Sequence, residues 1–260
     1  MTMNLQSIRQ MEARAARTWP AEESSLWQGW LLRASGGVTK RANSVLTAGE
    51  GPLGEAGWLE EIEAFYRERS LPPTFHVTDG SPASLDELLA SQGYEKEFPC
   101  EVMTAMTTDV QKAAESTHFK RGGSGRVRVI VQSRADEAWI HNFVRLEQFP
   151  EERLPFYRGL CERMPEGSRF FTLLHNDAPA AIATLVGEDG WGGIINVAVD
   201  ETLRGRGLGT VLMHALGCEA AANQIDRLYL QVVANNEPAY RMYRKLGFSP
   251  AYRFHYRVKH

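Results

Sequence analysis

The most informative stretch runs from Ile194 to Thr210 and reads I-I-N-V-A-V-D-E-T-L-R-G-R-G-L-G-T. Its apolar first half predicts a buried strand that ends at Asp200, its glycine-rich middle predicts a turn, and the apolar residues from Leu208 onward predict a helix. The first N–H groups of a helix have no partner within the helix, and glycines let the main chain approach an anion without a Cβ collision. The stretch therefore predicts an anion site; glycines that serve packing alone are the alternative.

The second half of the chain predicts a mixed α/β unit in which strands precede helices. The expected strands are Arg126–Val131, Arg169–Leu174, Ala180–Val186, Gly193–Val199, Leu228–Val233 and Tyr252–Val258. The expected helices are Ala135–Leu146, Glu152–Arg163, Leu208–Asn223 and Pro238–Leu246.

The first half follows much of the same order. It predicts helices at Ile8–Trp19, Trp58–Arg69 and Ser84–Ser91, and strands at Gly29–Ala34, Ala42–Thr47, Phe75–Thr78 and Glu101–Thr107. In both halves a strand, a proline-initiated helix and a Gly-aromatic pair follow one another, ending at Tyr94 and at Phe248. We therefore predict two diverged copies of one fold, 1–112 and 126–260, joined by a polar linker at 113–125. The alternative is that any two α/β halves look alike at this level.

Composition excludes several classes of protein. With 260 residues, 43% of them hydrophobic and 10% aromatic, the chain is long and apolar enough for one or two folded domains. The formal charge of −3 argues against a dedicated nucleic-acid binder. Three widely spaced cysteines make neither a disulfide framework nor a metal pattern. Without a membrane-span or signal-peptide pattern, we expect a cytoplasmic protein that uses no metal and binds no membrane.

A second stretch, Leu230 to Phe248, reads L-Q-V-V-A-N-N-E-P-A-Y-R-M-Y-R-K-L-G-F. Together the two stretches resemble the GCN5-related N-acetyltransferase family, in which a pyrophosphate loop Q/R-x-x-G-x-G/A is followed by N-x-x-A-x-x-x-Y-x-x-x-G-F. The first pattern is carried by Arg204, Gly207 and Gly209, and the second by Asn236, Ala239, Tyr243, Gly247 and Phe248. The resemblance covers about Arg126 to His260 and implies the acyl-CoA N-acyltransferase fold there, with a degenerate copy in the N-terminal half.

The resemblance also implies an acetyl-CoA-dependent N-acetyltransferase, with acetyl-CoA as co-substrate. The backbone of Val197, Ala198 and Val199 would pair with the pantetheine arm, and Asn236 beside Ala239 would contact the same arm. Tyr243 would be the general acid that protonates the leaving thiolate; packing on the helix face is the alternative for this side chain. The pyrophosphate would lie against the backbone of Arg204, Gly205, Arg206, Gly207, Leu208, Gly209 and Thr210.

The acceptor side departs from the family pattern. Many relatives carry a Glu or Asp on the strand before the pyrophosphate loop, whereas Asn196 is the only polar side chain on Gly193–Val199. An amide cannot act as a base. Candidate bases in the neighbouring turns are Glu188, Asp189, Glu147, Glu151 and Glu152, each of which is equally explained as a solvated turn carboxylate. No base is assigned, and the acceptor is expected to be an amine of a small molecule or peptide that attacks directly.

The first half contains a motif that resembles a dinucleotide-binding loop. Gly49, Gly51 and Gly54 match G-x-G-x-x-G, but Glu50 adds negative charge and Pro52 removes a backbone donor. As a degenerate counterpart of the later loop, this copy would carry Leu89 where the other has Tyr243. Two alternatives stay open: a non-catalytic acyl-CoA-binding regulatory module and a nicotinamide enzyme that uses the Gly49 loop. In the preferred interpretation the N-terminal half would shape the acceptor pocket or the interface of a homodimer.

Overall fold

The structure is a computed structural model that describes residues 3–118 and 126–260. The chain divides into two compact units, which we call unit 1 (Met1–Val102 with Ala251–His260) and unit 2 (Met103–Pro250). Strands β5 (Glu95–Met106) and β11 (Ser249–Val258) each begin in one unit and end in the other. The residues from Ala251 onward therefore belong to unit 1, although the sequence groups them with the second half.

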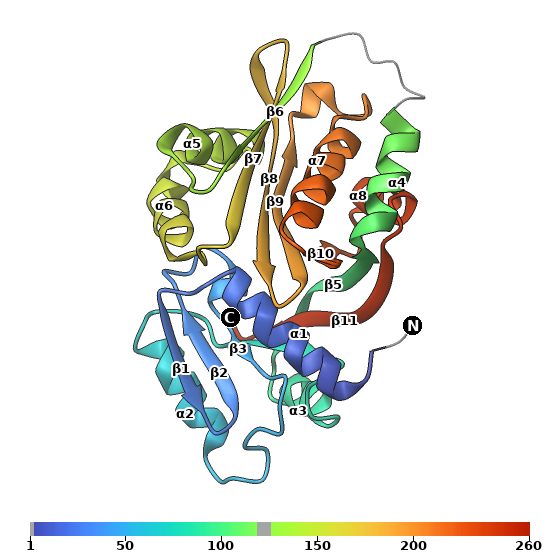
Figure 1. Ribbon diagram of the computed structural model, residues 1–260. Helices are drawn as coiled ribbons and strands as arrows, with labels where there is room; N and C mark the ends of the chain where they lie inside the picture. The colour runs from blue at the N-terminus through green and yellow to red at the C-terminus, as the bar shows by residue number, and fades with distance from the viewer. Residues whose placement is uncertain (1–2, 119–125) are drawn as a thin grey trace. The chain divides into compact units, whose positions relative to one another are not determined.

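Unit 2 is built on a mixed sheet with the strand order β5-β10-β9-β8-β7-β6 (Figure 1). Strands β6 to β9 are antiparallel neighbours, whereas β9 and β10 are parallel and are connected through a helix, as parallel neighbours require. The predicted mixed α/β fold is confirmed. The strands are β6 (Val127–Gln132), β7 (Ser168–His175), β8 (Ala178–Glu188), β9 (Trp191–Val199) and β10 (Arg227–Val233).

Helices cover both faces of this sheet. Helices α5 (Glu137–Leu146) and α6 (Leu154–Arg163) lie on one face, and α4 (Thr107–His118), α7 (Leu208–Ala222) and α8 (Glu237–Lys245) on the other (Figure 1). Successive residues of a strand point to opposite faces of the sheet. Phe170 of β7 therefore contacts Trp139 of α5, with ring centroids 5.1 Å apart. Its neighbour Phe171 packs on the other face, in the core with Leu212 and Leu216 of α7. The alternation of β7 thus supplies both cores of unit 2.

The sequence does not predict helix α4. It predicts a linker over 113–125, but α4 continues to His118, and 119–125 lie outside the described residues. The buried residues of α4 are Val110 and Ala114, and a Cβ on Gly217 of α7 would lie only 3.0 Å from Gln111. Since the two helices approach closely through small residues, the apolar period of α4 is too weak to be seen in the sequence.

Unit 1 has the strand order β1-β2-β3-β4-β11-β5. Its core gathers large apolar side chains such as Trp30, Tyr66 and Phe75, all fully buried. The sequence misses the edge strand β1, whose residues are mostly exposed, and the predicted strand at Ala42–Thr47 shortens to β3 after a 3₁₀ turn at Lys40–Ala42. The elements are β1 (Glu23–Trp27), β2 (Trp30–Ala34), β3 (Val45–Leu46), β4 (Thr74–Thr78), α1 (Leu5–Thr18), α2 (Trp58–Arg67) and α3 (Leu85–Ser91).

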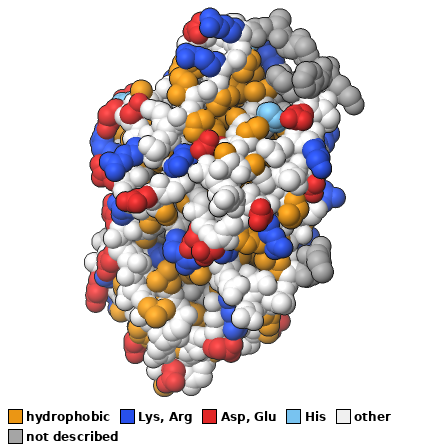
Figure 2. Space-filling view, in the orientation of Figure 1, with side chains coloured by type: hydrophobic (Ala, Val, Ile, Leu, Met, Phe, Trp, Pro, Cys, Tyr) orange, Lys and Arg blue, Asp and Glu red, His pale blue; other side chains and the backbone are white. Residues whose placement is uncertain are grey.

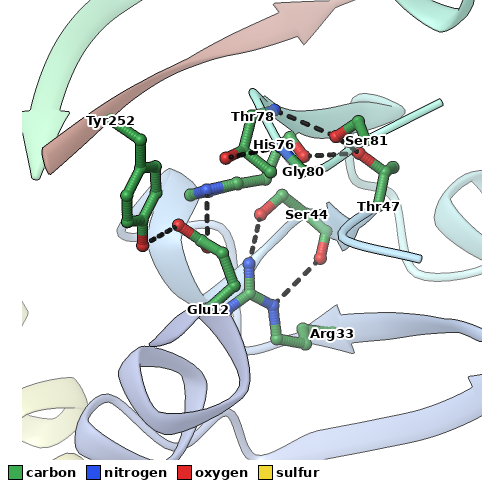
Figure 3. A network of polar contacts seen from close by, with 9 residues as sticks. All are labelled: Glu12, Arg33, Ser44, Thr47, His76, Thr78, Gly80, Ser81 and Tyr252. Atoms are coloured by element: carbon green, nitrogen blue, oxygen red, sulfur yellow. Dashed lines mark hydrogen bonds and ion pairs between the residues drawn. The ribbon is translucent and has the colours of Figure 1, made fainter. Parts of the chain in front are cut away.

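A network of buried polar side chains joins α1, β2, β4 and β11 in unit 1 (Figure 3). The Tyr252 hydroxyl donates to the Glu12 carboxylate over 2.7 Å, and His76 Nε2 lies 2.9 Å from the other carboxylate oxygen. Arg33 Nη2 donates to the Ser44 hydroxyl over 2.9 Å. Burial raises the pKa of Glu12, but its interactions with His76 and Tyr252 outweigh this and leave the pKa below its ordinary value. These polar partners therefore favour the charged form of the buried Glu12 carboxyl.

The charged side chains on the surface are mixed. Figure 2 shows basic and acidic side chains interspersed on the face in view, with apolar side chains between them. This distribution agrees with the small formal charge of the whole chain.

Candidate active site

A cavity of about 660 Å³ opens in unit 2 at the carboxyl end of β9. Clefts of this size with a few converging polar groups are the usual form of a small-molecule site. Of the residues that the family resemblance assigns to acetyl-CoA, all but Arg206 line the cavity; they are Val197–Val199, Arg204, Gly205, Gly207–Thr210, Asn236, Ala239 and Tyr243. Two stretches that lie far apart in the sequence therefore meet at one site.

The parallel strands β9 and β10 separate at this cavity. Their register runs from Trp191 paired with Arg227 only as far as Ile194 paired with Leu230. Beyond that point Val197–Val199 continue β9 and line the cavity without a partner residue on β10. The backbone N–H and C=O groups on that edge are therefore available to an extended ligand, which can bind as an added strand.

A β-bulge in β9 lies just beyond its last pair with β10. Against β8, Ile195 pairs with Thr184 and Ala198 pairs with Ile182, so that two residues of β9 face one of β8. Asn196 lies in the bulge with a φ of +56°, a conformation that asparagine tolerates better than most side chains. Its Nδ2 donates to the Thr184 hydroxyl over 3.2 Å, while its Oδ1 is buried without a hydrogen-bond partner in the described part of the chain.

The N-terminus of α7 faces the cavity without a cap of its own. Its N-cap is Gly207, with a φ of +86°; no side chain caps the helix, and its first turn holds no acidic residue. A Cβ on Gly209 would lie 2.8 Å from the Met242 sulfur, so this glycine serves the approach of α7 to α8. The exposed amides and the helix dipole together favour an anion at this end of α7.

Three cationic side chains also line the cavity. Arg204 lines it from the loop, and Arg241 and Lys245 line it from successive turns of α8. Arg206 is exposed and does not belong to the lining. Sequence reasoning missed Arg241 and Lys245, although their i, i+4 spacing places both on one face of the predicted helix.

Tyr243 is buried at the inner end of the cavity. Its side chain is 7% exposed and packs in the core with Leu246, with its ring 5.8 Å from that of Phe248. Burial raises the pKa of the phenol, and the neighbouring Glu147 carboxyl raises it further. No described residue forms a hydrogen bond with the hydroxyl group, which stays protonated near neutral pH and can donate to a ligand.

A family model described as "Probable histone acetyltransferase Rv0428c C-terminal" matches residues 6–257. The chain belongs to this family. A relative from Bacillus subtilis (strain 168), named "Uncharacterized N-acetyltransferase YobR", is 37% identical over 255 residues, which cover 98% of this chain and 100% of the relative. The relatives are acetyltransferases, and so is this chain.

Solved structures with similar folds agree with this assignment. A GCN5-related N-acetyltransferase from Kribbella flavida matches with a TM-score of 0.69 at 16% identity, covering 100% of this chain and 96% of that one. A tandem GNAT protein from the clavulanic acid biosynthesis pathway matches with a TM-score of 0.67 at 13% identity, covering 95% and 86% of the two chains. The predicted GCN5-related N-acetyltransferase fold is thereby confirmed.

Asn236 has a structural role in this acetyltransferase that the motif does not reveal. It is the N-cap of α8, and its side-chain oxygen accepts a hydrogen bond from the Ala239 N–H over 3.3 Å. Because Asn236 also lines the cavity, the cap places the start of α8 beside β9.

The structure separates the five candidate bases of the acetyltransferase. Glu188 and Asp189 lie at the turn between β8 and β9, the opposite end of β9 from the cavity. Glu151 and Glu152 are exposed in a 3₁₀ turn before α6 and do not line the cavity. Glu147, at the end of α5, does line it and is partly buried. The sequence alone could not distinguish these carboxylates, because all five lie in turns.

The glycine-rich loop of the first half has a packing explanation. A Cβ on Gly51 would lie 2.1 Å from the Trp30 ring, and one on Gly49 would lie 3.0 Å from the Gly29 carbonyl oxygen. Helix α2 begins at Trp58, after a further turn, and not directly after Gly54. These glycines therefore allow the loop to cover Trp30 in the core of unit 1.

The described residues offer neither a metal-binding cluster nor a membrane-spanning helix. Within 3–118 and 126–260, no group of three or more His, Cys, Asp or Glu side chains is arranged to hold a metal ion. No helix in those ranges is long and apolar enough to cross a membrane.

Proposed function

We propose that this acetyltransferase moves the acetyl group of acetyl-CoA to an amine of a small molecule or peptide by direct attack on the thioester. The observation that carries the proposal is the separation of β9 from β10 beyond Ile194 and Leu230. It leaves the edge of Val197–Val199 open next to an uncapped helix N-terminus and a buried phenol.

The described groups fit the donor along its length. The amides of the pantetheine arm would pair with the free edge of Val197–Val199, as an added strand does. The pyrophosphate would lie at the N-terminus of α7, where backbone N–H groups and Arg204 offer donors and positive charge. Arg241 and Lys245 would contribute further positive charge to the phosphates. Arg206, exposed on the same loop, would attract the anionic donor without lining the cavity.

The chemistry needs no covalent enzyme intermediate. The neutral amine nitrogen forms the new C–N bond to the acetyl carbon while the C–S bond breaks. The Tyr243 hydroxyl donates its proton to the departing thiolate, and the nitrogen loses one proton, which returns to the Tyr243 oxygen. No serine or cysteine lies among the described cavity-lining residues, which favours direct attack over an acyl-enzyme. Because the pKa of the phenol is raised, Tyr243 acts chiefly through a hydrogen bond to the charge that develops on sulfur.

We also propose that unit 1 is a diverged copy of the same fold without a donor site. In each unit three antiparallel strands are followed by a parallel neighbour, β1-β2-β3 then β4 and β7-β8-β9 then β10. Leu89, fully buried, stands in α3 where Tyr243 stands in α8. Without the phenol and the open loop, unit 1 lacks the groups that the proposed chemistry uses.

Thermal unfolding with and without acetyl-CoA tests the proposal. A ligand at about 100 times its Kd stabilises the folded state by about 2.7 kcal/mol, which for a chain of this size raises Tm by roughly 5–10 °C. We expect this shift in the wild type and its loss in Gly207→Glu, which places a carboxylate at the anion site. Gly190→Glu is the matched control, because Gly190 has a similar φ of +73° and lies in the turn between β8 and β9.

The outcomes are distinct. If Gly207→Glu does not fold, Gly205→Glu replaces it, since a Cβ on Gly205 would meet no atom within 4 Å. The absence of any shift with acetyl-CoA, together with a shift from a nicotinamide dinucleotide, would contradict the proposal. A shift with acetyl-CoA but no release of free CoA thiol with any amine would indicate a non-catalytic acyl-CoA-binding module instead.

A further inference from the structure

The cavity contains one carboxylate that the donor does not need. Among the described residues that line it, Glu147 is the only acidic one, and the cations Arg204, Arg241 and Lys245 gather around the loop and α8. Strand β9 offers Asn196 where a base would be expected, and an amide cannot accept a proton from an ammonium group near neutral pH. Glu147 is therefore the one described group in the cavity that can act as a base.

The fold holds Glu147 in place from both sides. Its backbone N–H donates to the Phe143 carbonyl over 3.0 Å at the C-terminal end of α5. On one side Arg145 donates to the Pro179 carbonyl over 2.9 Å and lies 3.4 Å from Asp200. On the other side Gln148 Nε2 donates to Glu201 over 2.7 Å. These contacts fasten the end of α5 to the loop between β9 and α7, so that Glu147 is fixed at the cavity wall.

The carboxylate itself is left without a partner. Glu147 is partly buried, yet its side chain forms no hydrogen bond or ion pair with any residue in the described ranges. Burial raises the pKa of this carboxyl, and the charge of Arg204 offsets only part of that effect. A desolvated carboxylate without a partner destabilises a fold, and such groups are concentrated at sites where the charge is used.

We propose that Glu147 is the general base of the acetyl transfer, taking a proton from the acceptor's ammonium group before the amine attacks; this role rests on the function proposed above. The ammonium group gives one proton to Glu147, and the neutral amine forms the C–N bond while the C–S bond breaks. The thiolate takes the Tyr243 proton, the attacking nitrogen returns its second proton to the Tyr243 oxygen, and Glu147 releases its proton to solvent. One proton is released for each acetyl group transferred.

The same geometry defines the acceptor class. A carboxylate in a cavity that Leu146 and Leu246 also line favours a primary amine that arrives as a cation. The acceptor is therefore a protonated primary amine, and an aromatic amine of low pKa would have no need of Glu147.

The test compares Glu147→Gln with the matched control Glu151→Gln. Glu151 lies just beyond Glu147 in the sequence but is exposed and outside the cavity lining. Release of free CoA thiol would be measured between about pH 6 and pH 9 with lysine, glucosamine, spermidine and a lysine-rich peptide. At pH 7 we expect Glu147→Gln to lower kcat/KM for the amine by about 100-fold or more, the usual effect of removing a general base. The deficit should shrink as pH rises toward the pKa of the amine, because free amine then needs no base. Glu151→Gln should match the wild type.

Binding of acetyl-CoA distinguishes a general base from a residue that only balances charge or maintains structure. The thermal shift with acetyl-CoA should be the same in Glu147→Gln and in the wild type. If Glu147→Gln shows a larger rise in Tm with acetyl-CoA and the same pH dependence of kcat/KM as the wild type, Glu147 only balances the charge of Arg204. That result would overturn the proposal. A loss of activity that is equal at every pH would overturn it too, since a structural defect has no such pH dependence. If the wild type releases no thiol with any of these amines, the proposed function itself fails.

Discussion

Helices α2 and α7 begin in the same way but differ in charge. Each starts at a glycine in the left-handed region, Gly57 with a φ of +78° and Gly207 with a φ of +86°, and neither has a side-chain cap. The first turn of α2 contains Glu60 and Glu61, whereas that of α7 contains no acid. In α2 two carboxylates of the helix itself lie near the positive end of the helix dipole. In α7 no carboxylate of the first turn does so, and an anionic ligand can bind there.

Helices α3 and α8 end in the same way but differ in chemistry. The N–H of Tyr94 donates to the Leu89 carbonyl and that of Phe248 to the Tyr243 carbonyl, both over 3.0 Å. The glycine before each aromatic residue has a positive φ, +82° in one unit and +93° in the other. The two turns thus have the same backbone geometry, whereas the side chain four residues before the glycine is a leucine in α3 and a phenol in α8. A few side chains, and not the fold, distinguish the unit with the candidate active site.

The largest effect is expected at the glycines of the two loops. In Gly51→Ala the new Cβ would lie 2.1 Å from the Trp30 ring at a backbone φ of +67°. The left-handed conformation and overpacking against a buried ring together cost roughly 2–5 kcal/mol. Urea unfolding followed by tryptophan fluorescence should show this loss in the free energy of unfolding, because the ring itself lies in the core of unit 1.

Gly205→Ala is the counterpart in the other loop. Gly205 has a similar φ of +77°, but its Cβ would meet no atom within 4 Å. The only cost is then that of holding a residue with a Cβ in the left-handed conformation, about 1–2 kcal/mol in the free energy of unfolding. Equal losses in the two variants would show that the loop of unit 1 is not held by close packing on Trp30, and the distinction drawn between the loops would be lost.

A smaller effect, on turnover, is expected from removing the phenol of α8. Tyr243→Phe keeps the ring in the core and deletes only the hydroxyl group. We expect kcat to fall by roughly 100-fold, about 2.7 kcal/mol in activation free energy. Acetyl-CoA binding, measured by the thermal shift, should hardly change because the donor is held mainly by backbone and charged groups. Steady-state release of CoA thiol measures the effect.

Tyr94→Phe provides the matched control in unit 1. The Tyr94 hydroxyl donates to Glu63 over 2.9 Å, so its removal should lower stability by about 1 kcal/mol. It should leave turnover unchanged, since unit 1 contributes no chemistry in our proposal. Full activity in Tyr243→Phe, or a similar loss in both variants, would remove the special role assigned to α8.

The elements of this fold were predictable where periodicity and turn residues are strong. Helix α7 and strand β9 follow directly from the apolar runs on either side of the glycine-rich turn. Helix α4 was beyond this reasoning, because its buried face consists of Val110 and Ala114 in an otherwise polar segment. The sharing of β11 between the units was also unpredictable, since a strand pattern does not indicate which sheet the strand joins.

The lining of the candidate site was predictable from two motifs, but its charges were not. The family resemblance that the two motifs carry predicted one site for Arg204, Asn236 and Tyr243, and all three line the cavity. It could not choose Glu147 among five turn carboxylates, because that choice depends on how α5 ends beside the loop after β9. Strand divergence at Asn196 is also invisible in sequence, since it depends on pairing with β8 and β10.

The smallest effect concerns a charge that α3 carries and α8 lacks. Three residues before Leu89 stands Asp86, whereas Tyr240 stands three residues before Tyr243. Asp86 accepts hydrogen bonds from Arg257 Nε over 2.7 Å and from His255 Nε2 over 2.6 Å, which ties α3 to β11. The hydrogen bond from Arg257, with smaller contributions from His255, lowers the pKa of Asp86 from 3.8 to about 2. A lowered pKa stabilises the fold above the ordinary value, and this stability is lost as the pH falls from about 4 toward 2.

Asp86→Asn should therefore lower the free energy of unfolding at pH 7 by only about 1 kcal/mol, because the Asp86 side chain is 35% exposed and solvent screens the pair. Urea unfolding at pH 7 and pH 3 should show the gap from the wild type narrowing at the lower pH, where the wild-type carboxylate begins to be protonated. Glu87→Gln, an exposed acid on the same helix, should show no gap at either pH. If the difference in free energy of unfolding between the wild type and Asp86→Asn stays constant with pH, Asp86 acts through packing. Helices α3 and α8 would then both be held to their neighbouring strands by packing alone.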